Sequence, residues 1–223
     1  MTNLVIVESP AKAKTINKYL GNDYIVLASY GHIRDLPSKN GSVIPEKNFE
    51  MIWETDSFSK KYLKEISDKA KNSDKIILAT DPDREGEAIA WHLKEFLDSK
   101  KLLKNKILER VVFREITKKS ILQAIEKPRQ IEISLVQAYL ARRALDYLVG
   151  FNISPILWTK LPGSKSAGRV QSVALKLITE REHLIELFKP EEYWTLTSNF
   201  INNQNKEISS KIIQFNENKI KRF

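Results

Sequence analysis

Two short runs of apolar, mostly β-branched residues are each followed at once by polar residues and then by a helical pattern. The runs cover residues 4–7 and 76–79. Apolar runs of this length, bounded by polar residues, predict buried strands. A third strand is predicted at residues 110–113, before a helix over 117–125. The repeated strand–loop–helix order predicts an α/β domain.

Apolar residues recur at helical spacing after both runs. The first helix is predicted to be capped by Ser9, with Pro10 suited to its first turn. The second is predicted to begin near Arg84 and to bury one stripe of its surface. That stripe comprises Ile89, Leu93, Phe96 and Leu97. Residues 62–70 predict another helix, whereas residues 22–58 predict shorter, turn-rich elements.

Beyond Pro128 the pattern becomes mainly helical. Helices are predicted over residues 136–149 and 155–160, followed by a long amphipathic helix over 168–188. After this helix the apolar residues alternate, and a polar turn at 202–205 interrupts them. Alternation on both sides of a turn predicts a β-hairpin.

The composition is that of a soluble globular protein, with 42% hydrophobic and 29% charged residues. Lys and Arg together number 37 against 28 Asp and Glu, and the formal charge of +9 favours a polyanionic partner. There is no cysteine, which excludes disulfides and thiolate metal sites and suits a reducing cytosol. Neither a signal peptide nor a membrane span is indicated, so we expect an intracellular protein without membrane contact.

Acidic residues gather directly after the two apolar runs. Asp81, Asp83 and Glu85 alternate, so an extended segment would point all three carboxylates the same way, and Glu8 follows the first run. Open α/β sheets bind ligands beyond the carboxyl ends of their strands. Carboxylates converging there repel one another unless a cation intervenes, and Mg²⁺ suits oxygen ligands. A metal site for phosphoryl transfer on nucleic acid is predicted; the alternative is a solvated turn with Glu85 and Glu87 as helix-dipole charges.

Several features favour phosphate and nucleic-acid contacts. Lys12, one turn from Glu8, could contact a phosphate or stabilise developing charge. Basic side chains outnumber acidic ones between residues 142 and 181: Arg142, Arg143, Lys160, Lys165, Arg169, Lys176 and Arg181 against Asp146 and Glu180. Phe151 and Trp158 lie among them and could stack on bases. The small residues 166–168 would let a phosphate approach the backbone.

Four segments together resemble the bacterial topoisomerase I group of the type IA DNA topoisomerases, over essentially the whole chain. They are Leu-Val-Ile-Val-Glu-Ser-Pro-Ala-Lys-Ala-Lys-Thr at 4–15, Gly-His-Ile-Arg-Asp-Leu-Pro at 31–37, Asp-Pro-Asp-Arg-Glu-Gly-Glu at 81–87 and Ser-Ala-Gly-Arg-Val-Gln at 166–171. The acidic segment alone would also fit primases and other Toprim proteins. The opening Val-Glu-Ser-Pro-Ala-Lys favours topoisomerase I over topoisomerase III.

The resemblance implies relaxation of negatively supercoiled DNA through cleavage of one strand, a 5′-phosphotyrosine link, strand passage and religation. It implies that Glu8, Asp81 and Asp83 coordinate Mg²⁺. It further implies that Glu85 assists catalysis and that Lys12 stabilises charge at the scissile phosphate. The positions that match the DNA contacts of the family are His32, Arg142, Arg143, Asp146, Phe151, Trp158, Ser166, Ala167, Gly168, Arg169, Val170 and Gln171.

The resemblance also implies three segments: a Toprim domain with a Rossmann-like, mostly parallel sheet over residues 1–130, a helical, winged-helix-like DNA-binding segment over 131–188, and the start of an arch domain over 189–223. The nucleophile of the family is a tyrosine in a Met-Arg-Thr-Asp-Ser context, which none of the seven tyrosines here has. We therefore expect this chain to be the N-terminal part of such an enzyme and to be inactive alone. We expect it to bind the single-stranded segment of negatively supercoiled DNA as a monomer. The expected location is the bacterial cytoplasm, at the nucleoid. A stand-alone Toprim nuclease or primase-like protein and a non-catalytic single-stranded DNA-binding module are the alternatives.

Overall fold

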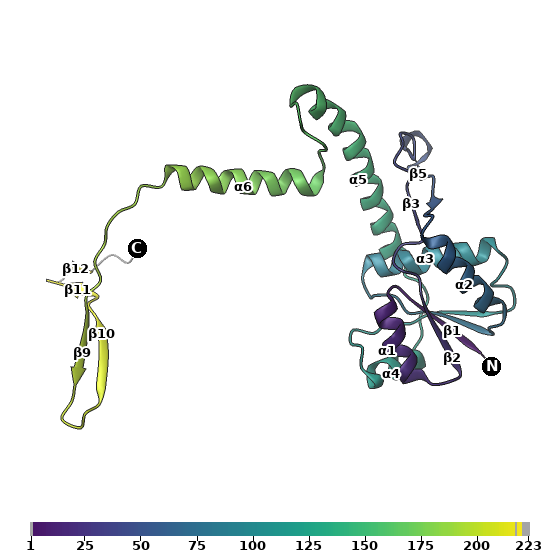
Figure 1. Cartoon of the computed structure of the whole chain (residues 1–223), viewed down its shortest axis with the longest axis horizontal. Coiled ribbons are helices and arrows are strands. Elements are labelled where there is room, and N and C mark those ends of the chain that lie inside the picture. The colour runs from purple at the N-terminus through teal and green to yellow at the C-terminus, as the bar shows by residue number, and fades with distance from the viewer. Residues whose placement is uncertain (1, 217, 220–223) are drawn as a thin grey trace. The chain divides into compact units, whose positions relative to one another are not determined.

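The computed structural model describes residues 2–216 and 218–219. It divides into two compact units, Met1–Ser172 and Val173–Phe223. The first contains a parallel sheet with its helices, and the second contains antiparallel strand pairs (Figure 1). The predicted segments 1–130, 131–188 and 189–223 stay a prediction.

The sheet of the first unit has four parallel strands in the order β2-β1-β7-β8. These strands are β1 (Asn3–Val7), β2 (Tyr24–Ala28), β7 (Lys75–Leu78) and β8 (Ile107–Arg110). Both apolar runs therefore form neighbouring central strands, which confirms the predicted α/β sheet. Because the strands are parallel, their carboxyl ends meet at one edge.

The predicted third strand at residues 110–113 is wrong, because β8 ends at Arg110. Val111 and Phe113 are buried, but they pack in the core beside α4 rather than extend the sheet. Arg110 also forms an isolated antiparallel bridge with Arg129. The buried apolar residues that follow β8 therefore gave the same sequence pattern as a strand.

Helices cover both faces of the sheet (Figure 1). They are α1 (Pro10–Leu20), α2 (Ser59–Lys71), α3 (Arg84–Ser99) and α4 (Lys118–Glu126). Alternate β1 residues face two cores: Leu4 and Ile6 pack with α2 and α3, whereas Val5 and Val7 pack with α1 and α4. The predicted cap of α1 is confirmed, because the Ser9 side chain accepts a hydrogen bond from the Lys12 amide.

Gly86 lets α3 begin directly against the loop that follows β7. A Cβ atom added to Gly86 would lie 2.2 Å from the Asp81 carbonyl oxygen, a separation that no side chain can adopt. The Thr80 hydroxyl donates to the Gly86 carbonyl at 2.5 Å and holds the approach. The glycine therefore fixes where the acidic loop lies relative to the helix.

Residues between β2 and α2 form a small arm of paired two-residue strands, as the turn-rich sequence predicts. β3 (Arg34–Asp35) pairs with β6 (Glu54–Thr55), and β4 (Val43–Ile44) pairs with β5 (Glu50–Met51). The 3₁₀ helix η1 (Pro45–Lys47) joins β4 to β5. The Ser42 amide donates to the Tyr147 hydroxyl at 3.0 Å and ties the arm to α5 (Ile133–Lys160).

The two helices predicted over residues 136–149 and 155–160 form one continuous helix, α5, with Pro155 inside it. The expected break is wrong: the proline removes one backbone hydrogen bond, to the Phe151 carbonyl, but α5 continues through it. The following α6 (Arg169–Leu187) matches the predicted long helix to within one residue at each end.

The second unit contains the predicted hairpin. β9 (Thr197–Ile201) pairs with β10 (Glu207–Lys211) in antiparallel register, and the turn includes Asn205 with a positive φ of 56°. Beyond β10 a second antiparallel pair forms from β11 (Gln214–Phe215) and β12 (Asn218–Lys219). Across the described residues, no helix has both the length and the apolar character needed to cross a membrane.

Candidate metal and nucleic-acid site

Two carboxylates meet at the carboxyl edge of the sheet. Glu8 follows β1 and Asp81 follows β7, and these strands are hydrogen-bonded neighbours. Lys12, in the first turn of α1, places its ammonium between them. Its Nζ atom contacts Oε1 of Glu8 and lies 2.5 Å from Oδ1 of Asp81. The strand order thus brings together residues that lie far apart in sequence.

The two carboxylates keep Lys12 charged. Burial lowers the pKa of Lys12, but its hydrogen bonds to Asp81 and Glu8 outweigh burial and raise the pKa above its ordinary value. The ammonium therefore balances part of the negative charge at this edge.

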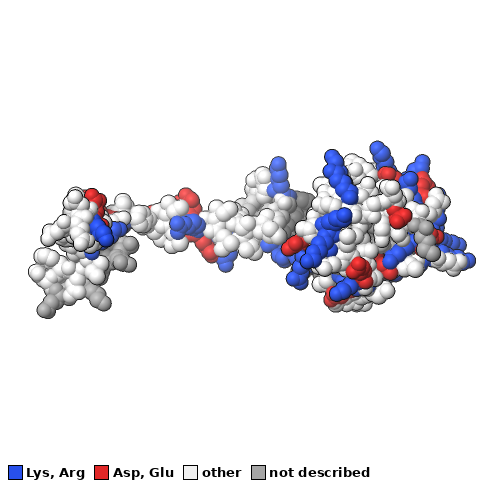
Figure 2. Space-filling model, turned by 90° about the horizontal axis from the view of Figure 1, so that it is seen from below, with Lys and Arg blue, Asp and Glu red and all other residues white. Residues whose placement is uncertain are grey.

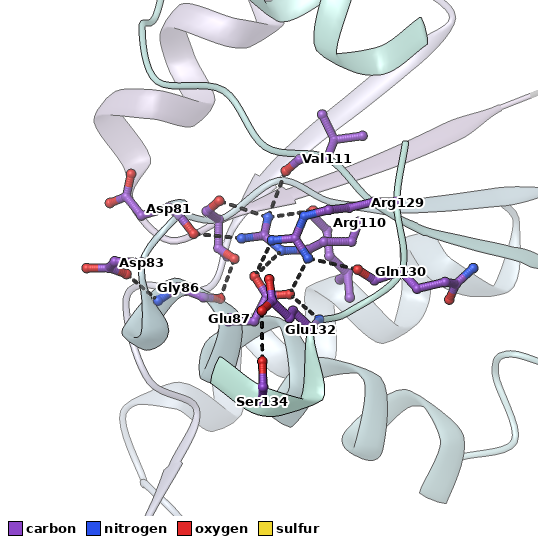
Figure 3. A network of polar contacts seen from close by, with 12 residues as sticks. Asp81, Asp83, Gly86, Glu87, Arg110, Val111, Arg129, Gln130, Glu132 and Ser134 are labelled. Carbon is purple, nitrogen blue, oxygen red and sulfur yellow. Dashed lines mark hydrogen bonds and ion pairs between the residues drawn. The ribbon is translucent and has the colours of Figure 1, made fainter. Parts of the chain in front are cut away.

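Glu8 and Asp81 fit a divalent cation, although no third predicted ligand joins them. Oε2 of Glu8 is buried and receives no hydrogen bond from the described residues, so a strong acceptor is left unsatisfied. The side chain of Asp81 is half-exposed. Asp83 instead accepts a hydrogen bond from the Gly86 amide at 2.8 Å and caps α3 (Figure 3). Among the described residues, no three His, Asp or Glu side chains form a group that could hold a metal.

The expected alignment of Asp81, Asp83 and Glu85 along an extended segment is wrong, because α3 begins at Arg84. Glu85 lies in the first helical turn, near His32. Burial lowers the pKa of His32, and the charge of Glu85 opposes that effect. The His32 ring stacks on Tyr139 with centroids 5.3 Å apart.

Glu87 is the centre of a buried ionic network that the sequence did not reveal (Figure 3). Its side chain is fully buried, and so is that of Arg110, whose Nε donates to Oε2 of Glu87 at 3.1 Å. Arg129 adds a bidentate contact at 2.8 and 2.7 Å, and the Glu132 amide donates at 2.7 Å. An arginine ending an apolar strand is the one sequence signal for this network.

Arg110 also binds the backbone that carries the acidic loop. Its Nη1 donates to the carbonyls of Leu78, Thr80 and Val111, and its Nη2 donates to the Asp81 carbonyl at 2.6 Å. The same guanidinium therefore holds Glu87 of α3 and the loop after β7. Through Arg129 and Glu132 the network extends to the start of α5.

A groove of about 590 Å³ lies along α5 and brings together several predicted DNA contacts. Of the predicted residues, Arg143, Asp146, Phe151, Trp158 and Ser166 line it. Lys165, one of the basic residues noted in the sequence, lines it as well, and so does Tyr147, which was not predicted. Phe151 stacks on Tyr147 with centroids 4.4 Å apart, so one face of each ring is already covered.

Ion pairs fix the charged groups in this groove, Asp146 and Arg143, and link Asp146 to two arginines outside the groove lining. Arg169 forms a bidentate contact with Asp146 at 2.8 and 3.2 Å, and Arg142 lies 3.6 Å from the same carboxylate. The Arg169 hydrogen bond lowers the pKa of Asp146. Arg143 forms a bidentate contact with Asp35 at 2.8 and 2.7 Å.

The segment before α6 is held by α5. The Ser154 hydroxyl accepts from the Ala167 amide at 3.1 Å and donates to its carbonyl at 3.3 Å. Trp158 Nε1 donates to the Lys165 carbonyl at 2.6 Å. Gly168 precedes α6, and the exposed Val170 and Gln171 lie in its first turn.

Comparisons with known proteins agree with this arrangement. The Toprim domain family matches residues 3–116, and the DNA topoisomerase family matches residues 130–223. The fold and the acidic edge define the chain as a Toprim protein, and it belongs to the bacterial type I DNA topoisomerase family within that class.

Relatives and a solved structure extend over nearly the whole chain. DNA topoisomerase 1 of Rickettsia felis is 57% identical over 99% of this chain, and that of Zymomonas mobilis is 58% identical over 98%. The chain spans 28% and 18% of the length of these two relatives. The structure of full-length topoisomerase I from Thermotoga maritima matches 98% of this chain and 36% of its own, with a TM-score of 0.76 at 42% identity.

We predict that Glu87→Gln lowers the free energy of unfolding near neutral pH by about 3 kcal/mol, because Arg110 and Arg129 lose a buried anionic partner. Burial raises the pKa of Glu87, but the Arg129 and Glu132 hydrogen bonds outweigh it and lower the pKa. The ionised carboxylate therefore stabilises the fold above its ordinary pKa of 4.5, and this stability is lost as pH falls through the folded pKa.

Urea unfolding of the wild-type chain and of Glu87→Gln, measured from neutral to acidic pH, should show the difference in their free energies of unfolding becoming smaller in acid. Glu65→Gln, an exposed substitution on α2, is the matched control and should change little. A difference that stays constant with pH would show that ionisation of Glu87 does not stabilise the fold.

Proposed function

We propose that this chain supplies the metal-binding edge and part of the DNA groove of a type IA DNA topoisomerase. The whole enzyme would relax negatively supercoiled DNA by transient cleavage of one strand through a 5′-phosphotyrosine, strand passage and religation. The observation that carries the proposal is the Lys12 ammonium held between Glu8 and Asp81 at the carboxyl edge of the sheet. The relatives named DNA topoisomerase 1 support it.

Each side chain at the edge has a role in this proposal. Glu8 and Asp81 would hold Mg²⁺, with Asp83 as a further ligand once its side chain leaves the cap of α3. The bound ion would supply positive charge to the phosphate oxygens. Lys12 would hold a phosphate oxygen beside the two carboxylates. Glu85, close to His32, would assist the proton transfers at the attacking and leaving oxygens.

The groove along α5 would hold the single strand. Arg142, Arg143 and Arg169 supply charge for phosphates, and Trp158 and Phe151 supply aromatic surface for bases. Asp146 would keep two of these arginines oriented. Lys and Arg side chains lie at several places on the face of the first unit seen in Figure 2, among patches of Asp and Glu. DNA in the bacterial cytoplasm, at the nucleoid, is the proposed partner, and the protein is proposed to act as a monomer.

The Mg²⁺ assignment is tested by Asp81→Asn combined with Asp83→Asn. We expect calorimetry to show loss of Mg²⁺ binding with the fold retained, because Asp81 is half-exposed and asparagine also caps helices well. Asp98→Asn, at the exposed end of α3, should bind Mg²⁺ like the unchanged chain. Undiminished Mg²⁺ affinity in the double variant would remove the metal role from this edge.

Arg169→Ala should weaken binding of single-stranded DNA and reduce the slope of its salt dependence by about one, because one fewer phosphate is neutralised. Fluorescence anisotropy at several salt concentrations gives the slope. Lys104→Ala is the control, because this exposed lysine precedes β8 at the opposite edge of the sheet. If Arg169→Ala shows the same salt-dependence slope as Lys104→Ala and the wild type, Arg169 is not a phosphate contact.

The chain alone should not relax supercoiled plasmid, because none of its seven tyrosines has the sequence context of the nucleophile in this family. Tyr139 lies near Glu85, but burial raises its pKa to about 12 and keeps its hydroxyl protonated. An agarose-gel assay of highly purified chain with Mg²⁺ measures relaxation. Activity that disappears when one of the seven tyrosines becomes phenylalanine would identify a nucleophile in this chain and contradict the prediction.

A further inference from the structure

Three aromatic side chains, two of them exposed and one half-buried, form a cluster on the first unit that we call the aromatic platform. It consists of Tyr30, Phe58 and Tyr62. Tyr30 stacks on Tyr62 with centroids 3.7 Å apart and an interplanar angle of 21°. Phe58 meets Tyr62 edge-on at 5.3 Å and Tyr30 at 6.4 Å. The rings therefore support one another in a fixed arrangement.

The platform lies outside the apolar cores of the sheet. Tyr30 is 42% exposed and Phe58 is 63% exposed, whereas the α2 residues that pack against the sheet, Leu63 and Ile66, are almost fully buried. Tyr30 also adopts a left-handed backbone conformation with φ of 60°, which is uncommon for a bulky residue. An exposed aromatic group held in this way is typical of a binding surface rather than of packing.

Backbone contacts place the platform beside the candidate metal edge. The Ser29 amide donates to the Val7 carbonyl at 2.8 Å, and the Gly31 amide donates to the Glu8 carbonyl at 2.9 Å. Tyr30 lies between these two anchors, directly after β2. Its loop therefore belongs to the same carboxyl edge as Glu8 and Asp81.

The charges around the platform favour a polyanion. Lys60, Lys61 and Lys64 are exposed on α2. Lys61 shares the helix stripe of Phe58 and Tyr62 with the exposed Glu65, so the lysines outnumber this acidic residue three to one. The nearby Asp56 carboxylate is engaged, because it accepts from the Phe58 and Ser59 amides at 3.1 and 3.3 Å. Aromatic rings with lysines beside them are the combination that binds single-stranded nucleic acid, since the bases stack while the lysines attract phosphates. A duplex keeps its base faces stacked and offers nothing to such rings.

We propose that the aromatic platform stacks an unpaired base of the DNA strand that passes the metal edge. This inference rests on the proposed function and adds a contact, built by the loop after β2 and by α2, to the groove along α5. Stacking needs no hydrogen bond to a base edge, so the contact is tolerant of base identity. The platform would hold the strand in place close to Glu8 and Asp81.

The test uses the full 223-residue chain and a variant that combines Tyr30→Asn with Phe58→Leu. Asparagine tolerates the left-handed backbone, and leucine preserves the apolar contact of the first turn of α2. The probes are a labelled oligothymidylate and an oligomer of the same length with abasic sugars. We expect the variant to bind oligothymidylate roughly tenfold more weakly, since a base loses its stacking surface, and to bind the abasic oligomer like the unchanged chain.

Phe49→Asn is the matched control, because Phe49 is also aromatic, 52% exposed and left-handed at φ of 58°, but lies in the β4–β5 arm. The Phe49→Asn variant should bind both probes with the same affinity as the unchanged chain. The stacking proposal is overturned if the platform variant binds oligothymidylate as tightly as the wild type, or if it loses affinity equally for both probes. Neither outcome changes the test of Arg169. A wild-type chain that binds neither probe would overturn the proposed function as well.

Light scattering tests a different role for the platform, contact between two copies of the chain. If the wild type forms dimers that the platform variant does not form, and the two bind oligothymidylate equally, the platform serves self-association and the proposal is overturned. Circular dichroism and urea unfolding of each variant verify that the fold is retained. A variant that fails to fold is replaced by Phe58→Leu alone, for which a severalfold loss confined to oligothymidylate is expected and equal affinity contradicts the proposal.

Discussion

The buried contact between Arg110 and Glu87 holds the acidic edge in place. Backbone carbonyls at and just beyond the ends of β7 and β8 lie in buried surroundings, and buried carbonyls require hydrogen-bond donors. The planar guanidinium of Arg110 supplies donors to four carbonyls and to Glu87 at once. Glu87 in turn accepts from Arg129 and from the Glu132 amide. A buried ion pair is favourable only when its remaining donors and acceptors are satisfied, and this network meets that condition.

The network also explains how the acidic edge and the groove along α5 are held at fixed positions within the first unit. Arg110 fixes the loop that carries Asp81, and Glu87 fixes the first residues before α5, which carries Arg142, Arg143 and Asp146. A shift of either element would leave a buried charge without its partner. The acidic edge and the basic groove therefore have a defined relation within the first unit. This relation would serve the proposed reaction on a phosphodiester, because the strand must be held while its backbone reacts.

Local patterns in the sequence were sufficient for β1, β7 and the cap of α1, but they did not locate β2 or β8. Residues 4–7 and 76–79 could be assigned because buried parallel strands are continuously apolar, and Ser9 because a cap acts within one helical turn. The interactions that sequence patterns missed are long-range. Glu87 meets Arg110 and Arg129 across 23 and 42 residues, and no periodicity encodes such a pairing. Pro155 was misjudged for a related reason, because the packing of α5, not local propensity, decides whether the helix continues.

The acidic segment shows the same division between local and long-range causes. Its alternating carboxylates suggested one extended row of ligands, but Gly86 lets α3 begin so close to Asp81 that Asp83 becomes a cap and Glu85 enters the helix. Lys12 then occupies the space between Glu8 and Asp81, where its charge offsets their repulsion. The unsatisfied oxygen of Glu8 remains beside it. A phosphate entering this edge would compete with the carboxylates for Lys12. Displacing the ammonium would free both carboxylates, so binding of a phosphate and of a divalent cation at this edge would reinforce each other.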